Sequence, residues 1–333
     1  MSPISEVIIN KQTSLKPIWV MRQAGRYLPE FREIRKINPD FIKLCLNNNL
    51  ASEITLQPLK RFDPDAAIIF SDILMLPFGL NQSVEFKKGL GPILGDLDIK
   101  NISQIDEIDF VEKVYPIYKA INQVKNHQLT NEKSVIGFIG APWTLLVYMI
   151  NKQSPKIKLK DGFYKDEFLI NRVLSILDKF LKIHIKNQIE NGAEVIQIFD
   201  SWAGLLDEKD LPNYVYIPTL TLVEYVKSLN VPVICFPRGI KNYKAYCDIV
   251  KPDAICIDYE VDPIKISKEI KIPVQGGMDP KVLLTDKENI KKEAKKYLDI
   301  FKDHPYIFNL GHGILPETDP GMMDYLVKTV KDN

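Results

Sequence analysis

Short runs of apolar, often β-branched residues recur along the chain and are separated by longer segments with helical spacing. Eight runs predict strands: Ile18–Met21, Ala66–Phe70, Val135–Ile139, Val195–Phe199, Val231–Phe236, Ala254–Ile257, Ile272–Val274 and Tyr306–Leu310. Helical periodicity is clearest over Phe163–Glu190, Pro212–Leu229 and Lys287–Phe301. Strands that alternate with helices are typical of βαβ units and a parallel sheet.

Eight strand–helix repeats favour an α/β fold of the closed (β/α)8 TIM-barrel type, whose functional residues lie at the carboxyl ends of the strands. A doubly wound open sheet is the structural alternative. After the second strand, Val84–Ile93 breaks the pattern and predicts a small inserted hairpin. Its Gly89-x-Gly91 does not join a strand to a helix, so a phosphate loop is not favoured. The chain has no long linker or short repeat, and we expect a single domain over 1–333.

The composition narrows the classes of function. The 333 residues are 45% hydrophobic and 26% charged, and the net charge of +1 gives no electrostatic case for nucleic-acid binding. We expect a cytoplasmic protein without a membrane partner, because the N-terminus lacks a signal-peptide pattern and no apolar run approaches the roughly 18 residues that span a bilayer. The four cysteines form no C-x-x-C pair and the four histidines no H-E-x-x-H. Reduced thiols and no metal site are expected.

The segment Met21–Arg32 carries the strongest functional signal. Arg22 leaves the core where the first predicted strand ends, and Arg26 lies four residues on, with Gly25 between them to let the backbone turn or approach a ligand. Guanidinium groups bind carboxylates and phosphates through two parallel hydrogen bonds and stay charged. A solvated basic loop is the alternative. The strand-end position, the glycine and the aromatic neighbours favour an anion-binding segment beside an apolar surface.

Other polar residues follow other predicted strands, and a barrel would bring them to the same mouth. Asp72 could cap the next helix or stabilise positive charge where water is excluded. His312 lies between two glycines, which favours ligand contact or acid–base chemistry over packing. Tyr148 could face the core or the site. Ser201 lacks a G-x-S-x-G context, so donation to a ligand carboxylate or helix capping is favoured over a hydrolase triad.

These motifs make the chain resemble the uroporphyrinogen decarboxylase family. The signature P-[IV]-W-x-M-R-Q-A-G-R-Y-L-P-E-[FY]-R occurs at 17–32 and G-F-x-G-A-P-[WF]-T-L at 137–145, with further matches at 70–74, 197–204, 275–280 and 311–313. The resemblance implies a (β/α)8 barrel, a homodimer and a lyase of haem (porphyrin) biosynthesis. Such an enzyme converts uroporphyrinogen III to coproporphyrinogen III by removing the carboxyl groups of its four acetate arms as CO2. Two departures are minor: Asp319 replaces a proline common in bacterial relatives, and Asp200 replaces a Glu of some eukaryotic ones.

The resemblance also implies roles for individual residues. Substrate binding is implied for Arg22, Gln23, Ala24, Gly25, Arg26, Asp72, Tyr148, Ser201 and His312, with Arg22, Asp72, Tyr148 and His312 as the catalytic candidates. Asp72 would hold the pyrrole nitrogens and stabilise a cationic intermediate. A pyrrole protonated at its α-carbon is itself an electron sink, so no cofactor is expected. The proton donor stays open, since a guanidinium such as Arg22 is a poor acid at neutral pH; His312, Tyr148 and a water are alternatives.

Two other functions are the alternatives. A zinc-dependent corrinoid methyltransferase of the same superfamily would need thiolate and imidazole ligands, typically an H-x-C pair, and the sequence has none. A non-catalytic tetrapyrrole-binding protein could keep the arginines, so that only turnover separates it from an enzyme.

Overall fold

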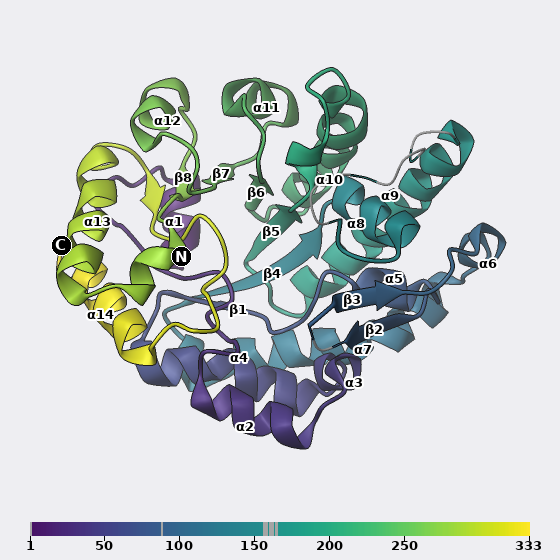
Figure 1. Ribbon diagram of the computed structural model, residues 1–333, viewed down its shortest axis with the longest axis horizontal. Coiled ribbons are helices and arrows are strands. Elements are labelled where there is room, and N and C mark those ends of the chain that lie inside the picture. The colour runs from purple at the N-terminus through teal and green to yellow at the C-terminus, as the bar shows by residue number, and fades with distance from the viewer. Residues whose placement is uncertain (1, 88, 156–158, 160–162, 164–165) are drawn as a thin grey trace.

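Seven parallel strands form a curled sheet at the centre of the protein, and helices surround it (Figure 1). The computed structural model describes residues 2–87, 89–155, 159, 163 and 166–333. The strands follow one another in chain order: β1 (Ala66–Ile68), β4 (Ser134–Gly140), β5 (Val195–Asp200), β6 (Val233–Pro237), β7 (Ala254–Ile257), β8 (Val274–Gly276) and β9 (Tyr306–Ile307). Every strand–helix–strand unit therefore adds its new strand at the same edge.

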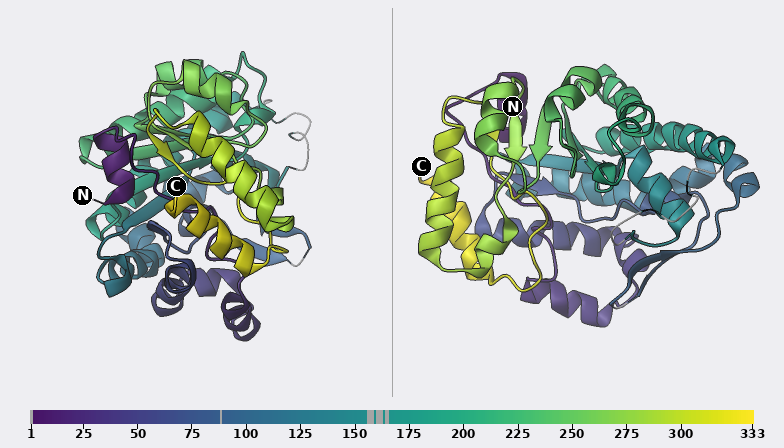
Figure 2. Two further views of the ribbon diagram at one scale, coloured as in Figure 1. Left: turned by 90° about the vertical axis from the view of Figure 1, so that its left-hand side faces the viewer. Right: turned by 45° about the horizontal axis from the view of Figure 1, so that its top comes forward.

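The helices lie mainly in the connections between these strands. They are α1 (Pro3–Ile9), α2 (Pro29–Ile37), α3 (Phe41–Cys45), α4 (Asn48–Phe62), α5 (Met75–Gly79), α6 (Ile99–Ser103), α7 (Glu107–Lys125), α8 (Pro142–Asn151), α9 (Glu167–Glu190), α10 (Ile217–Ser228), α11 (Tyr243–Val250), α12 (Pro263–Glu269), α13 (Lys287–Ile300) and α14 (Pro320–Lys331). The chain ends at α14, which packs beside α13 and α4 (Figure 2). No helix among the described residues is long and apolar enough to cross a membrane.

Seven of the eight predicted strand segments overlap a strand, and Ile18–Met21 does not form a regular one. Ile18 makes a single parallel bridge to Phe308, and its carbonyl accepts from the Asp65 N–H at 2.7 Å. The Trp19 N–H donates to the Phe308 carbonyl at 3.3 Å, but side chains accept from its neighbours: the Asp65 carboxylate accepts from the Ile18 N–H at 2.8 Å, and the Asn309 amide oxygen accepts from the Met21 N–H at 3.0 Å. The segment thus lies between β9 and β1 without a continuous ladder.

The predicted helices form with shifted ends. The pattern over Phe163–Glu190 becomes α9, which begins at Glu167 because the Asp166 carboxylate accepts from the Leu169 N–H at 2.8 Å; residues 164–165 lie outside the described part. Pro212–Leu229 becomes a π-helical turn followed by α10. After β1, β2 (Val84–Lys87) and β3 (Gly91–Leu94) pair in antiparallel fashion, and Lys88 between them lies outside the described residues.

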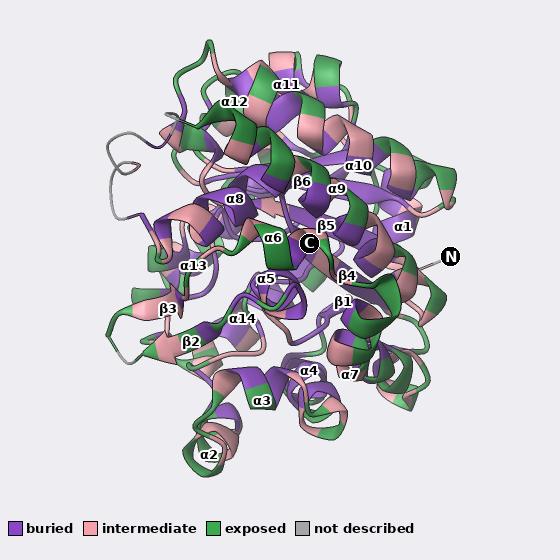
Figure 3. Cartoon of the chain, turned by 90° about the vertical axis from the view of Figure 1, so that its right-hand side faces the viewer, coloured by how far each residue is buried: buried purple, intermediate pink, exposed green. Residues whose placement is uncertain are grey.

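Buried side chains fill the inside of the curled sheet. In Figure 3 the strands are mostly coloured as buried, and the exposed residues lie on the outer helices and loops. Alternate strand residues such as Ile136, Ile234 and Cys256 form this inner cluster together with Ile4 and Val7 of α1. The Ile4 N–H donates to the Ser134 hydroxyl at 3.0 Å, so α1 covers the end of the sheet where β4 begins. The carboxyl ends of the strands form the opposite end, where the candidate residues follow.

Candidate active site

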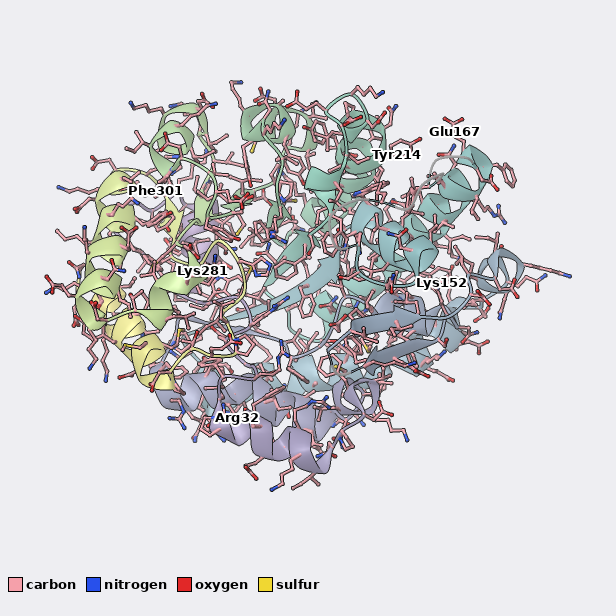
Figure 4. The ribbon with its side chains drawn as sticks, viewed as in Figure 1. Arg32, Lys152, Glu167, Tyr214, Lys281 and Phe301 are labelled. Carbon is pink, nitrogen blue, oxygen red and sulfur yellow. The ribbon has the colours of Figure 1, made fainter. Side chains whose placement is uncertain are left out.

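The arginine segment, Met21–Arg32, begins where the chain passes in space between β9 and β1, and it folds back on itself at the carboxyl ends of the strands. Arg22 has φ +65°, in the left-handed region that few residues other than glycine adopt. The Gly25 carbonyl accepts from the Leu28 N–H at 3.0 Å, and Ala24 packs partly buried against the core. Arg32, labelled on α2 in Figure 4, donates to the carbonyls of Arg26 at 3.0 Å and Tyr27 at 2.9 Å. These contacts fix the direction in which Arg22 and Arg26 leave the backbone.

Gln23 holds this segment in place and presents no surface to a ligand. It is fully buried; its amide nitrogen donates to the Ala66 carbonyl at 2.8 Å, and its amide oxygen accepts from the Val20 N–H at 3.1 Å. The Tyr27 hydroxyl donates to the Gln23 carbonyl at 2.9 Å. The family resemblance implies that Gln23 contacts substrate. Its geometry gives it a different role, which is to tie the arginine segment to β1.

Asp72 interacts electrostatically with Arg22, and its pKa is raised above the ordinary value of an aspartate. The Leu74 N–H donates to one carboxylate oxygen at 2.8 Å, which is a local turn contact and not a cap of α5, whose N-cap residue is Leu74. Burial raises the pKa of Asp72 to about 6, against the opposing effects of the Leu74 N–H and the Arg22 charge. At pH 7 the carboxylate is therefore mostly ionised, poorly hydrated and faced by a guanidinium.

The Arg22 side chain is open to solvent on one side and closely surrounded by protein on the others. Part of its surface is exposed, yet the loss of hydration on the enclosed side lowers its pKa. The charges of Arg26 and Arg238 lower this pKa further, whereas the charge of Asp72 raises it. A Cβ atom added at Gly313 would lie 2.4 Å from the Arg22 Cδ, so the guanidinium arm passes directly over the Gly313 backbone. Only glycine at this position permits that approach.

His312 is held as a neutral hydrogen-bond donor. Burial and the charges of Arg22 and Arg238 lower its pKa to about 4. The Gly313 N–H donates to His312 Nδ1 at 2.7 Å, so the neutral ring carries its proton on Nε2. At neutral pH this ring can donate a hydrogen bond from Nε2, whereas its imidazolium form is scarcely populated.

A buried network holds Tyr148 and the turn that carries Ser201. The Thr144 hydroxyl donates to Asp200 at 2.6 Å and accepts from the Trp202 N–H at 3.1 Å. The Tyr148 ring packs edge-on against the Trp202 ring with centroids 5.9 Å apart, and its hydroxyl lies 3.2 Å from that of Ser154. Burial, assisted by the Asp72 charge, raises the Tyr148 pKa, so the phenol stays protonated. Burial also raises the pKa of Asp200 to about 7.

The fold thus brings most of the predicted residues together. Arg22 and Asp72 interact electrostatically with each other and with Tyr148, and the Arg22 charge also reaches His312. Ala24, Gly25 and Ser201 lie on the turns that carry these groups. Sequence reasoning missed Arg238, although a cation directly after a strand is the same signal that identified Arg22. No group of three or more His, Cys, Asp or Glu side chains in the described ranges could hold a metal ion.

Comparison with solved structures supports the fold alone. A methyltransferase from Methanosarcina mazei superposes with a TM-score of 0.80 at 14% sequence identity, covering 99% of this chain and 97% of the other. Sequence comparison is more specific, because the family model described as Uroporphyrinogen decarboxylase (URO-D) matches residues 1–333. The chain belongs to the uroporphyrinogen decarboxylase family. The family predicted from the arginine signature is therefore confirmed.

Curated members of the uroporphyrinogen decarboxylase family resemble this chain along nearly its whole length. The uroporphyrinogen decarboxylase of Wolbachia pipientis wMel is 44% identical, covering 95% of this chain and 93% of the relative. That of Rickettsia felis is 42% identical, covering 97% and 96%. The match to the family model, over residues 1–333, spans every strand end that carries a candidate residue.

Proposed function

We propose that this chain is a uroporphyrinogen decarboxylase, which removes the carboxyl groups of the four acetate arms of uroporphyrinogen III as CO2 and forms coproporphyrinogen III. The observation that carries the proposal is an ionised, poorly hydrated Asp72 facing Arg22 at the strand ends of a chain in this family. Whole-length similarity to curated decarboxylases supports it. The methyltransferase and the tetrapyrrole carrier are not favoured.

The proposed chemistry uses the charges of the site. A proton adds to the α-carbon of a pyrrole, and the ring becomes cationic. The bond to the carboxylate then breaks, CO2 leaves, and the electron pair neutralises the ring as an exocyclic methylene forms. That methylene takes up a proton to become a methyl group, and the α-carbon loses its proton. Asp72 stabilises both cationic stages, because a fixed carboxylate acts strongly where water is largely displaced.

The remaining residues bind and orient the substrate in this proposal. Arg22 and Arg26 bind carboxylate arms, Tyr148 donates from its protonated phenol, and His312 donates from Nε2. Ala24, Gly25 and Ser201 contribute the adjoining surface, while Gln23 positions the two arginines. The proton that starts the reaction arrives through a water or through Tyr148, since the His312 pKa of about 4 leaves that ring neutral. No cofactor takes part, because the pyrrole accepts the electron pair.

We further propose that Ile18–Met21 serves as the missing strand of a closed (β/α)8 barrel, with β2 and β3 as an inserted hairpin and 1–333 as one catalytic domain. The hydrogen bonds of the Trp19 N–H to the Phe308 carbonyl, at 3.3 Å, and of the Asp65 N–H to the Ile18 carbonyl support closure. Like its family, the protein is proposed to act as a cytoplasmic homodimer without membrane or nucleic-acid partners. Sedimentation at several concentrations would test the dimer.

Turnover of uroporphyrinogen tests the function directly. Purified protein incubated with uroporphyrinogen should give porphyrins with seven, six, five and finally four carboxyl groups once the products are oxidised and separated. Full activity should persist after dialysis against a strong chelator. Binding without loss of carboxyl groups would identify a tetrapyrrole carrier instead. Activity that vanished on chelation and returned with zinc would favour the methyltransferase.

A further inference from the structure

Arg238 follows β6 directly, and its backbone is fixed on both sides. Its N–H donates to the Asp200 carbonyl at 3.1 Å, and its own carbonyl accepts from the Gly204 N–H at 3.0 Å. The next N–H, that of Gly239, donates to the buried Asp258 carboxylate at 2.9 Å. Only main-chain atoms of Arg238 make these contacts, so its half-buried side chain is presented from a rigid turn without contributing to it.

The turn after β6 lies against the turn after β5, which carries Ser201. A Cβ atom added at Gly204 would lie 2.6 Å from the Gly239 carbonyl oxygen, so the two backbones touch. The guanidinium of Arg238 in turn acts on the residues across the site, because its charge lowers the pKa values of Arg22 and His312. Arg238 therefore belongs to the same cluster, although it comes from another strand end.

The cluster formed by Arg22, Arg26, Asp72, Arg238 and His312 holds more positive than negative charge. Arg22, Arg26 and Arg238 form no salt bridge with any described residue, and Asp72 is the carboxylate that acts on Arg22. Asp258, which lies near the Arg238 turn, is occupied by the N–H groups of Gly239 and Glu260. Uncompensated cations that are partly removed from water are costly, and an anionic ligand relieves that cost.

We propose that Arg238 binds a second carboxylate arm of the tetrapyrrole substrate, approaching from β6 while Arg22 and Arg26 approach from the segment between β9 and β1. This inference rests on the proposed function. A macrocycle with carboxylates all around its rim can rotate about a single anchor, whereas anchors on two separate strand ends fix which acetate arm lies beside Asp72. Arg238 is thus a substrate-orienting residue, and it does not touch the bond that breaks.

The Arg238→Gln variant tests this role. We expect KM for uroporphyrinogen to rise at least about tenfold, as for loss of a charge-assisted hydrogen bond, with kcat changed much less. Arg172→Gln, which removes an exposed arginine from α9, is the matched control and should leave both constants unchanged. Without substrate, the pKa of His312 in Arg238→Gln should rise from about 4, measured by NMR titration of the ring, because one neighbouring cation is gone.

The outcomes separate this inference from the proposed function. If the wild-type protein does not decarboxylate uroporphyrinogen, the proposed function fails. If the wild type is active and a folded Arg238→Gln variant keeps the wild-type KM, the function stands and the role of Arg238 is overturned. Arg238→Lys serves as the second variant should glutamine impair folding. It keeps the charge but loses the planar fork, so an unchanged KM in that variant would equally overturn the proposal.

Discussion

The Asp72→Asn variant is expected to lose on the order of 100-fold or more in kcat while substrate affinity changes little. Asparagine has nearly the same shape and can still accept the Leu74 N–H, so the turn after β1 should survive. What disappears is the charge that stabilises the cationic pyrrole, and this charge matters more in the transition state than in the bound substrate. Steady-state kinetics would measure the effect.

The same carboxylate predicts the pH dependence of the reaction. With an Asp72 pKa of about 6 in the free protein, kcat/KM should fall as the pH drops through 6, because protonation removes the required charge. The raised pKa of Asp72 has the opposite effect on the stability of the fold, which decreases as the pH rises. A carboxyl whose pKa is raised on folding stabilises the fold at low pH, and this contribution is lost as the pH rises through 6. Asp72→Asn should thus raise the free energy of unfolding at pH 8, by at most about 3 kcal/mol.

Asp109→Asn is the control for both measurements, because Asp109 is exposed on α7, far from the strand ends in sequence. It should change neither kcat nor the pH profile. A folded Asp72→Asn variant with wild-type kcat would leave Asp72 with its turn contact to Leu74 as its sole role. The cation would then be stabilised by another group.

The sequence predicted elements whose signal is local. Runs such as Ala254–Ile257 are apolar at every position because parallel strands inside a shell of helices are buried on both faces. Arg22 and Asp72 were found because polar residues directly after such runs lie together at one end of a parallel sheet. Ile18–Met21 had the same apolar pattern. It does not form a regular strand because the Asp65 and Asn309 side chains replace two of its backbone partners. These contacts span more than forty residues, and no local pattern contains them.

Properties that depend on three-dimensional neighbours could not be predicted. The neutral state of His312 follows from burial and from two arginines on other elements. Substrate contact by Gln23 was implied by the family resemblance, and its hydrogen bond to the Ala66 carbonyl appears only in the fold. Arg238 follows a strand directly, as the sequence shows, but nothing in the sequence places it beside the turn that carries Ser201. Its role follows from the contact between the turns after β5 and β6.

Arg22→Lys is expected to reduce kcat/KM by on the order of 100-fold, although the positive charge is kept. An ammonium cannot reproduce the planar fork that binds a carboxylate through two hydrogen bonds. The loss should affect kcat as well as KM, since Arg22 faces Asp72 and helps to set the position of the reacting pyrrole.

Arg26→Lys should mainly raise KM, because Arg26 is exposed and reaches Arg22 only through its charge. Raised salt should weaken wild-type binding only moderately, since screening is reduced where water is largely displaced.

Gly313→Ala examines the position of the Arg22 guanidinium without changing any charge. The added methyl group would meet the Arg22 Cδ at 2.4 Å, so the arm must move, while the Gly313 backbone itself can accept alanine. We expect a loss of kcat/KM in the same direction as in Arg22→Lys, and the double variant should be little worse than either single one, because both changes disturb the same contact. Arg172→Lys is the control for the arginine change. Additive losses in the double variant, or wild-type kinetics in both single variants, would show that the carboxylate arms are held elsewhere than over Gly313.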